Sequence, residues 1–228
     1  MENLPLYISL VFGLTTCLTV FLFYKATNNS IRFIIIISLW LIVQTIISVQ
    51  GFYTVSKGMP PRFLLLILPP IILIATLFLT TRGRQFIDSL NLKALTLLHI
   101  IRVPVEVVLF CLFLNKAVPE LMTFEGRNFD IVSGLTAPFI FYFGFIKKTL
   151  GKKIILLWNF ICLGLLINIV IIAILSAPLS IQKFAFDQPN RALLYFPFIW
   201  LPCCIVPLVL FSHLASIRQL LRQVNNNQ

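Results

Sequence analysis

Apolar residues form long stretches along this chain, and short polar connections separate them. A helix needs about 20 mostly apolar residues to cross a bilayer, and each stretch approaches that length. The pattern predicts seven transmembrane helices, at about Leu4–Tyr24, Phe33–Tyr53, Phe63–Thr81, Ala94–Leu114, Ile131–Ile146, Ile154–Leu175 and Phe196–Ile217. The expected fold is therefore all-α, a polytopic integral membrane protein with a single seven-helix transmembrane domain over residues 1–228.

Prolines inside two of these stretches predict kinks. Pro69 and Pro70 lie in the third stretch, and Pro197, Pro202 and Pro207 lie in the seventh. Proline has no backbone N–H and its ring clashes with the preceding turn, so a membrane helix tolerates it only where neighbours satisfy the freed carbonyl. We therefore expect the third and seventh spans to be kinked.

The composition agrees with this fold class. Hydrophobic residues make up 59% of the chain and charged residues 11%, and the mean hydropathy is +1.00. About a quarter of the residues of a soluble domain are charged, so these values exclude an ordinary water-exposed surface. The net charge of +11 comes from Lys and Arg residues that lie almost entirely between the apolar stretches. This placement indicates contacts with anionic lipid headgroups and not with nucleic acid.

The Lys and Arg residues are unevenly shared between the two sides of the membrane. Alternate connections place 11 of them on one side and 6 on the other, and one more, Arg102, lies within the fourth span. The smaller set is Lys57, Arg62, Lys116, Arg127, Lys183 and Arg191. Because cytoplasmic loops carry the excess of Lys and Arg, we expect the N-terminus outside and the C-terminus in the cytoplasm. The connection KKTLGKK is the strongest single signal.

Two segments on the expected cytoplasmic side have an amphipathic helical pattern. In residues 214–224, apolar residues recur at helical spacing opposite Arg218, Gln219 and Arg222. The linker at residues 82–93 has a similar pattern. Both segments favour short helices at the membrane surface.

The fourth stretch is the only one that contains charged residues. His99, Arg102 and Glu106 follow one another at spacings of three and four residues, which puts them on one face of a helix. We expect Arg102 and Glu106 to pair directly. An arginine or an acid at the centre of a membrane helix costs about 2.5–3.5 kcal/mol even on a lenient scale, and such residues mark functional sites by default. The alternative is a buried pair that orients the helix and has no other role.

The only two histidines of the chain are expected at the same depth in the membrane. His99 lies about five residues into the fourth span, and His213 lies about four residues before the end of the antiparallel seventh span. Both are therefore roughly 6–8 Å from the same boundary. Polar side chains of four spans, several of them at this depth or deeper, predict a ligand-binding chamber of His99, Arg102, Glu106, Asn159, His213, Gln44 and Asn168. The alternative is that both histidines are interfacial residues that reach the headgroups.

The connection NKAVPELMTFEGRNFDIVSG, expected on the outer side, is rich in charge. It carries Glu120, Glu125, Arg127 and Asp130. Its Leu, Met and Phe residues are poor choices for a solvated loop, so we expect it to fold back onto the mouth of the bundle. Its acids could attract a cationic ligand or pair with Arg127 as a lid, and plain surface structure is the slightly preferred interpretation.

Motifs of the common enzyme classes are absent from the sequence. No Walker A, Rossmann glycine fingerprint, H-E-x-x-H or G-x-S-x-G occurs, and we expect no metal site. The five cysteines all lie in apolar stretches, which does not indicate a disulfide framework. Neither the third nor the seventh span has a lysine that could hold retinal.

Several functions are compatible with these observations. We rank first an integral membrane protein that binds, and transports or senses, a small solute, with Arg102 meeting an anionic group and Glu106 or a histidine carrying a proton. An intramembrane enzyme acting on a lipid or lipid-linked substrate is second. A haem-binding electron carrier with His99 and His213 as paired axial ligands is third, and a scaffold subunit is the fourth. The expected partners are membrane lipids and a small-molecule or lipid ligand, and the sequence assigns no cofactor.

Overall fold

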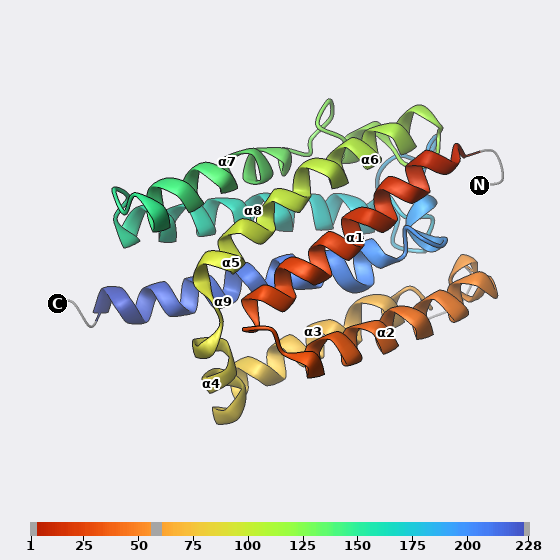
Figure 1. Ribbon diagram of the computed structural model, residues 1–228. Helices are drawn as coiled ribbons and strands as arrows, with labels where there is room; N and C mark the ends of the chain where they lie inside the picture. The colour runs from red at the N-terminus through yellow and green to blue at the C-terminus, as the bar shows by residue number, and fades with distance from the viewer. Residues whose placement is uncertain (1–3, 56–60, 226–228) are drawn as a thin grey trace.

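The computed structural model describes residues 4–55 and 61–225, and the fold of these residues is all-α (Figure 1). Lys57, which belongs to the smaller set of basic residues, lies outside the described residues. Helix α1 begins at one end of the elongated bundle and α9 ends at the other (Figure 1). We call these the α1-start end and the α9-finish end.

The helices follow the apolar stretches closely. They are α1 (Leu6–Ala26), α2 (Ile31–Val49), α3 (Leu64–Leu79), α4 (Thr81–Ser89), α5 (Leu92–Leu98), α6 (Arg102–Leu114), α7 (Ile131–Phe141), α8 (Lys152–Leu175) and α9 (Val206–Asn225). A 3₁₀ turn, His99–Ile101, joins α5 to α6, and π-helical segments at Tyr142–Ile146 and Leu201–Ile205 adjoin α7 and α9. Single 3₁₀ turns occur at Phe52–Thr54, Glu120–Met122 and Ala192–Leu194.

Long apolar helices of this kind are those of a multi-pass membrane protein. Among the described residues, five are long and apolar enough to cross a membrane, and the bent pair of α3 and α4 raises the number to six. The segment Ile131–Ile146 is a shorter apolar helix. These numbers rest on length and composition.

Helix α9 occupies the centre of the bundle. In Figure 1 it runs between α7 and α8 on one side and α2 and α3 on the other, while α1 and the α5–α6 helix cross in front of it. In the apolar window of Leu201–Val224, 72% of the residues are buried within the molecule, against 11% in that of α2. Helix α2 therefore turns most of its apolar surface outward, where an apolar medium such as lipid favours it and water does not.

The turn between α5 and α6 has a local cause. Pro104 has no N–H to donate to the carbonyl of Ile100 four residues earlier, so the α-helical ladder cannot continue unbroken through this point. The chain passes through the 3₁₀ turn His99–Ile101 instead. The break lies inside the candidate span Leu92–Leu114, next to its charged residues.

Helix α4 lies at the lower left of Figure 1, beside the end of α3 and below α9. It is bent by 95° from α3, and the side chain of Thr80 caps it by accepting a hydrogen bond from the backbone N–H of Gly83 at 3.1 Å. Its Asp88 carboxylate accepts hydrogen bonds from Arg218 and Arg222 of α9. Residues 214–224 continue α9 without a break, so the amphipathic segment expected there is the last part of that helix, tied to α4.

Helix α2 is attached to the π-helical segment Leu201–Ile205 by a side-chain hydrogen bond. Pro207 cannot donate to the carbonyl of Cys203 four residues earlier. The indole N–H of Trp40 donates to this carbonyl at 2.9 Å. The freed acceptor of a proline-containing helix is thus satisfied by a neighbouring helix, as a membrane interior requires.

Candidate functional site

Charged and polar side chains meet near the middle of the bundle. Arg102 lies near the midpoint of the 23-residue candidate span Leu92–Leu114. The loop at residues 115–130, between α6 and α7, folds inward to reach it, and in this loop Asn128 is fully buried and Asp130 is 5% exposed. We call the following set the buried polar network: His99, Arg102, Glu106, Asn128, Asp130, Asn159 and His213.

Arg102 makes its ion pair with Asp130. Its Nη1 donates to the Asp130 carboxylate at 2.6 Å and to the backbone carbonyl of Cys162 at 3.4 Å. The expected direct pair of Arg102 with Glu106 is wrong, because among the described residues the only carboxylate within 4.0 Å of the guanidinium is that of Asp130. Helical spacing predicted a partner within one turn, but the folded loop supplies one that is 28 residues away.

Hydrogen bonds define which ring nitrogen of His213 carries a proton. Nη2 of Arg102 lies 2.9 Å from Nε2 of His213, and because a guanidinium only donates, Nε2 must accept. The other nitrogen, Nδ1, is therefore the donor and faces Oδ1 of Asn159 at 2.9 Å. Nδ2 of Asn159 donates to the carbonyl of Ile155 at 2.9 Å, which fixes the orientation of the amide. A continuous chain of hydrogen bonds thus runs from the loop to α8.

Glu106 is held by an amide of the same loop. Nδ2 of Asn128 donates to both carboxylate oxygens of Glu106, at 2.6 and 2.7 Å, and to the carbonyl of Met122 at 3.0 Å. Oδ1 of Asn128 accepts from the backbone N–H of Asp130 at 3.1 Å. Within the described part of the chain, no Lys, Arg or His nitrogen lies within 4.0 Å of the Glu106 carboxyl group. The network therefore contains two carboxyl groups and one guanidinium.

The two histidines stack on each other. The ring centroids of His99 and His213 are 3.8 Å apart with an angle of 14° between the planes, and Trp158 contacts His99 edge-on at 5.5 Å. Paired axial ligands of haem must each point a nitrogen at an iron that lies between them. Face-to-face rings at this separation leave no room for a porphyrin, so this arrangement does not support the haem interpretation.

Several polar atoms of the site have no hydrogen-bond partner among the described residues. They are both ring nitrogens of His99, Nε of Arg102 and, one helical turn beyond His213, the hydroxyl of Ser216. A buried polar group normally has a partner in the protein, in water or in a ligand. Among the described residues, no cluster of three or more His, Cys, Asp or Glu side chains could hold a metal ion.

Other residues of the expected chamber lie elsewhere. Gln44 accepts a hydrogen bond from the hydroxyl of Tyr53 at 2.6 Å, in a separate buried cluster. Tyr53 follows the candidate span Ile31–Val49, and burial raises the pKa of its hydroxyl to about 12. Asn168 is exposed on α8 and donates to the backbone carbonyl of Arg127 at 2.9 Å, so it holds the loop and is not part of the buried polar network.

The charged loop residues divide into two groups. Glu120, Glu125 and Arg127 are exposed, whereas Asp130, expected with them in the outer connection, is buried against Arg102. Asn128 was not among the expected site residues. The available signal was the apolar character of the loop, which predicted a fold-back but not which of its polar residues would enter the bundle.

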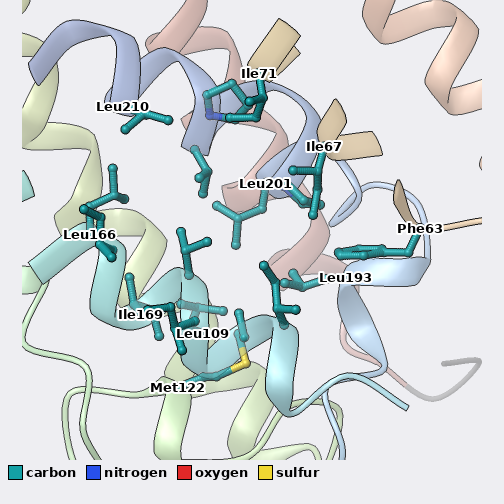
Figure 2. A pocket seen from close by; sticks show the side chains of 18 residues that line it. Phe63, Ile67, Ile71, Leu109, Met122, Leu166, Ile169, Leu193, Leu201 and Leu210 are labelled. Atoms are coloured by element: carbon teal, nitrogen blue, oxygen red, sulfur yellow. The ribbon is translucent and has the colours of Figure 1, made fainter. Parts of the chain in front are cut away.

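An apolar cavity of about 180 Å³ lies beside this region, between α3, α6, α8 and α9. Figure 2 shows side chains such as Leu109, Met122 and Leu166 pointing into it. The described residues that line it are apolar, with the sulfur of one methionine among them, and none of them carries a charge that could orient a polar solute. The buried polar network remains the candidate site for polar chemistry.

The comparisons with known proteins identify a family. The family model described as Domain of unknown function (DUF8737) matches residues 59–221. The chain belongs to the DUF8737 family. The DUF8737 match spans more than two thirds of the chain, from before α3 to near the end of α9, and it includes every residue of the buried polar network. No curated protein and no solved structure matches the chain.

Proposed function

We propose that the chain crosses the membrane seven times, with its N-terminus outside and its C-terminus in the cytoplasm. The short segments α3 and Ile131–Ile146 would join the five long candidate spans. An odd number of crossings agrees with the start of α1 and the finish of α9 at opposite ends of the bundle (Figure 1). The excess of Lys and Arg supports the orientation, and the prolines of the third and seventh spans would kink them.

We propose that this protein binds a small polar solute in the buried polar network and carries it across the membrane. The observation that carries the proposal is that one loop supplies the partners of both charged side chains of α6. Asn128 bonds Glu106, and Asp130 bonds Arg102. Outward movement of the loop would uncover both groups at once, which is how a gate is coupled to the site that it covers.

The charges of the network favour a solute that carries an amino group. Arg102 already has an anionic partner in Asp130. When both carboxyl groups are ionised, the network has one negative charge in excess, and Glu106 is the carboxyl group that pairs with no cation among the described residues. A protonated amine would supply the missing charge. The 3₁₀ turn beside the site fits this role, because breaks inside membrane helices commonly form solute sites and hinges.

Access to the site can be measured at Cys162. This buried cysteine lies in α8, and its carbonyl contacts Arg102. A membrane-impermeant methanethiosulfonate added outside sealed vesicles should modify its thiol, and mass spectrometry of peptides identifies the labelled position. Asn128→Ala removes the amide that bonds Glu106 and the backbone of Met122 and Asp130. Leaving a buried polar group without its partner costs about 1–3 kcal/mol, so the rate should rise by about 5- to 150-fold. Cys162→Ala is the matched control for label on other cysteines.

The class of solute can be tested in the same assay. Methylamine and ethanolamine should slow the modification of Cys162, whereas acetate and glycolate, of matched size, should not. Glu106→Gln should remove the preference for amines. The proposal fails if Cys162 reacts only from the cytoplasmic side, or if it stays unreactive from outside even in the Asn128→Ala variant. Uptake of radiolabelled methylamine into proteoliposomes then separates a carrier from a sensor.

A further inference from the structure

A second and larger cavity lies on the other side of α3. It has a volume of about 500 Å³ and is lined by parts of α1, α2, α3, α4 and α9. Three helical segments contribute comparable lengths to it: residues 32–40 of α2, residues 69–77 of α3, and residues 203–211, which run from the π-helical segment Leu201–Ile205 into α9. We call this cavity the α2–α3 groove. No residue of the buried polar network lines it.

The length of the groove corresponds to one leaflet of a bilayer. Each of the three lining segments rises about 12 Å from its first to its last residue. The hydrocarbon core of a bilayer is about 30 Å thick, so the groove covers most of one leaflet. Its shallow end lies at Ser30, Arg32 and Phe86, next to α4, and its deep end lies at Trp40, Cys203 and Pro69.

The two ends of the groove differ in polarity. At the shallow end Arg32 is exposed, and among the described residues it has no carboxylate within 4.0 Å. At the deep end the indole N–H of Trp40 and the carbonyl of Cys203 are already bonded to each other. A molecule in the groove therefore meets, at the shallow end, a guanidinium group that pairs with no carboxylate of the described residues. At the deep end it meets an indole N–H and a carbonyl that already have their hydrogen-bond partner in each other. None of the described residues that line the cavity of Figure 2 carries a charge.

The groove is open at the outer surface of the bundle. Two of its lining residues, Ile36 of α2 and Leu73 of α3, are 64% and 56% exposed. A lipid could therefore move in sideways from its own leaflet. The shallow end is also on the expected cytoplasmic side, where anionic lipids are concentrated.

We propose that the α2–α3 groove binds one acyl chain of an anionic phospholipid whose phosphate group contacts Arg32. The chain lies between α2, α3 and α9 and ends near Trp40. The guanidinium group can donate two hydrogen bonds to one phosphate. In a zwitterionic lipid the cation of the headgroup partly screens the phosphate charge, so we expect Arg32 to favour an anionic lipid. This site is separate from the buried polar network and does not depend on the solute-binding proposal.

Trp40 can report directly on the occupant. The chain has three tryptophans, so Trp158→Phe with Trp200→Phe leaves Trp40 alone. The purified full-length variant is placed in vesicles of phosphatidylcholine that contain a low mole fraction of a lipid with brominated acyl chains. Brominated phosphatidylglycerol should quench Trp40 with about fivefold higher apparent affinity than phosphatidylcholine with the same brominated chains. Arg32→Gln should bring the two lipids to equal affinity.

Matched variants separate the groove from general surface charge. Arg84→Gln removes an exposed arginine of α4 that does not line the groove, and it should leave the fivefold preference intact. Ile37→Phe fills the groove and should weaken quenching by brominated phosphatidylglycerol, whereas Ile35→Phe, an exposed position outside it, should not. The proposal is overturned if both brominated lipids quench Trp40 equally in the parent protein. It is also overturned if Arg84→Gln lowers the preference as much as Arg32→Gln does.

Discussion

Arg102 joins parts of the chain that lie far apart in the sequence. It bonds Asp130 in the loop, the carbonyl of Cys162 in α8 and His213 in α9. All of these groups are buried. A buried pair gains stability only when the geometry and the remaining hydrogen bonds are good, and removing one partner leaves an uncompensated charge. The guanidinium group of Arg102, in α6, therefore holds the loop, α8 and α9 together by hydrogen bonds.

Asp130→Asn should therefore destabilise the protein by about 3–5 kcal/mol, because Arg102 keeps its charge and loses its counter-ion. Thermal unfolding of the purified protein in detergent, followed by circular dichroism, measures the change. Asp88→Asn is the comparison, since its carboxylate is 25% exposed in its pairs with α9, and the loss there should be about 1 kcal/mol or less.

The double variant Arg102→Met with Asp130→Leu tests the cause. It removes both charges of the pair and should recover most of the stability that Asp130→Asn loses, since apolar replacements of a buried pair are often neutral. A double variant as unstable as Asp130→Asn would mean that the missing counter-ion is not the reason for the loss.

At the scale of elements, the close approach of α7 to the α5–α6 break keeps the loop in place. A Cβ atom on Gly134 would lie 2.8 Å from the side chain of Val103, 2.9 Å from its backbone nitrogen and 3.2 Å from Cβ of Arg102. The first two distances are shorter than packed atoms allow, and the third is tighter than most contacts of a Cβ atom. Only glycine at this position allows α7 to begin beside Arg102 and so brings Asp130 within reach of it.

Gly134→Ala should separate α7 from α6, with a loss of about 1–3 kcal/mol from overpacking. Because Asp130 directly precedes α7, the same variant should speed the modification of Cys162 from outside. Gly164→Ala in α8 is the control, because a Cβ there meets nothing within 4 Å, and it should be neutral or slightly stabilising. Equal effects of the two substitutions in unfolding and labelling would contradict this account of the interface.

At the scale of the whole molecule, α9 connects the two candidate sites. One side of α9 contributes His213 to the buried polar network. The π-helical segment Leu201–Ile205, which directly precedes α9, contributes Cys203 and Cys204 to the α2–α3 groove. The last turns of α9 are tied to α4 through Asp88. A tilt of α9 would therefore change both sites, and both would change together with the α4 surface helix.

The proposed topology has a direct test with introduced cysteines. Thr149→Cys lies in the basic connection before α8, and Asp187→Cys lies in the connection before the π-helical segment of α9. In intact cells an impermeant maleimide should label position 187 and not position 149, and inverted vesicles should give the reverse. Labelling of position 149 in intact cells would reverse the proposed orientation, and labelling of both positions from one side would rule out seven crossings.

The apolar stretches alone were sufficient to predict the all-α fold and most helix positions. A helix in lipid satisfies its backbone within itself, so its existence depends on local composition. The same local information placed His99, Arg102 and Glu106 on one face, and the structure brings His99 and His213 into contact.

Side-chain partners were decided by the tertiary structure. Asp130 and His213 lie 28 and 111 residues from Arg102, and no periodicity links positions so far apart. Gln44 had the same polar character as Asn159 but bonds Tyr53 in another cluster, since α2 lies away from α8. Spacing along the chain determines which face of a helix a residue occupies, and only the packing of helices and the inward fold of the loop determine what that face meets.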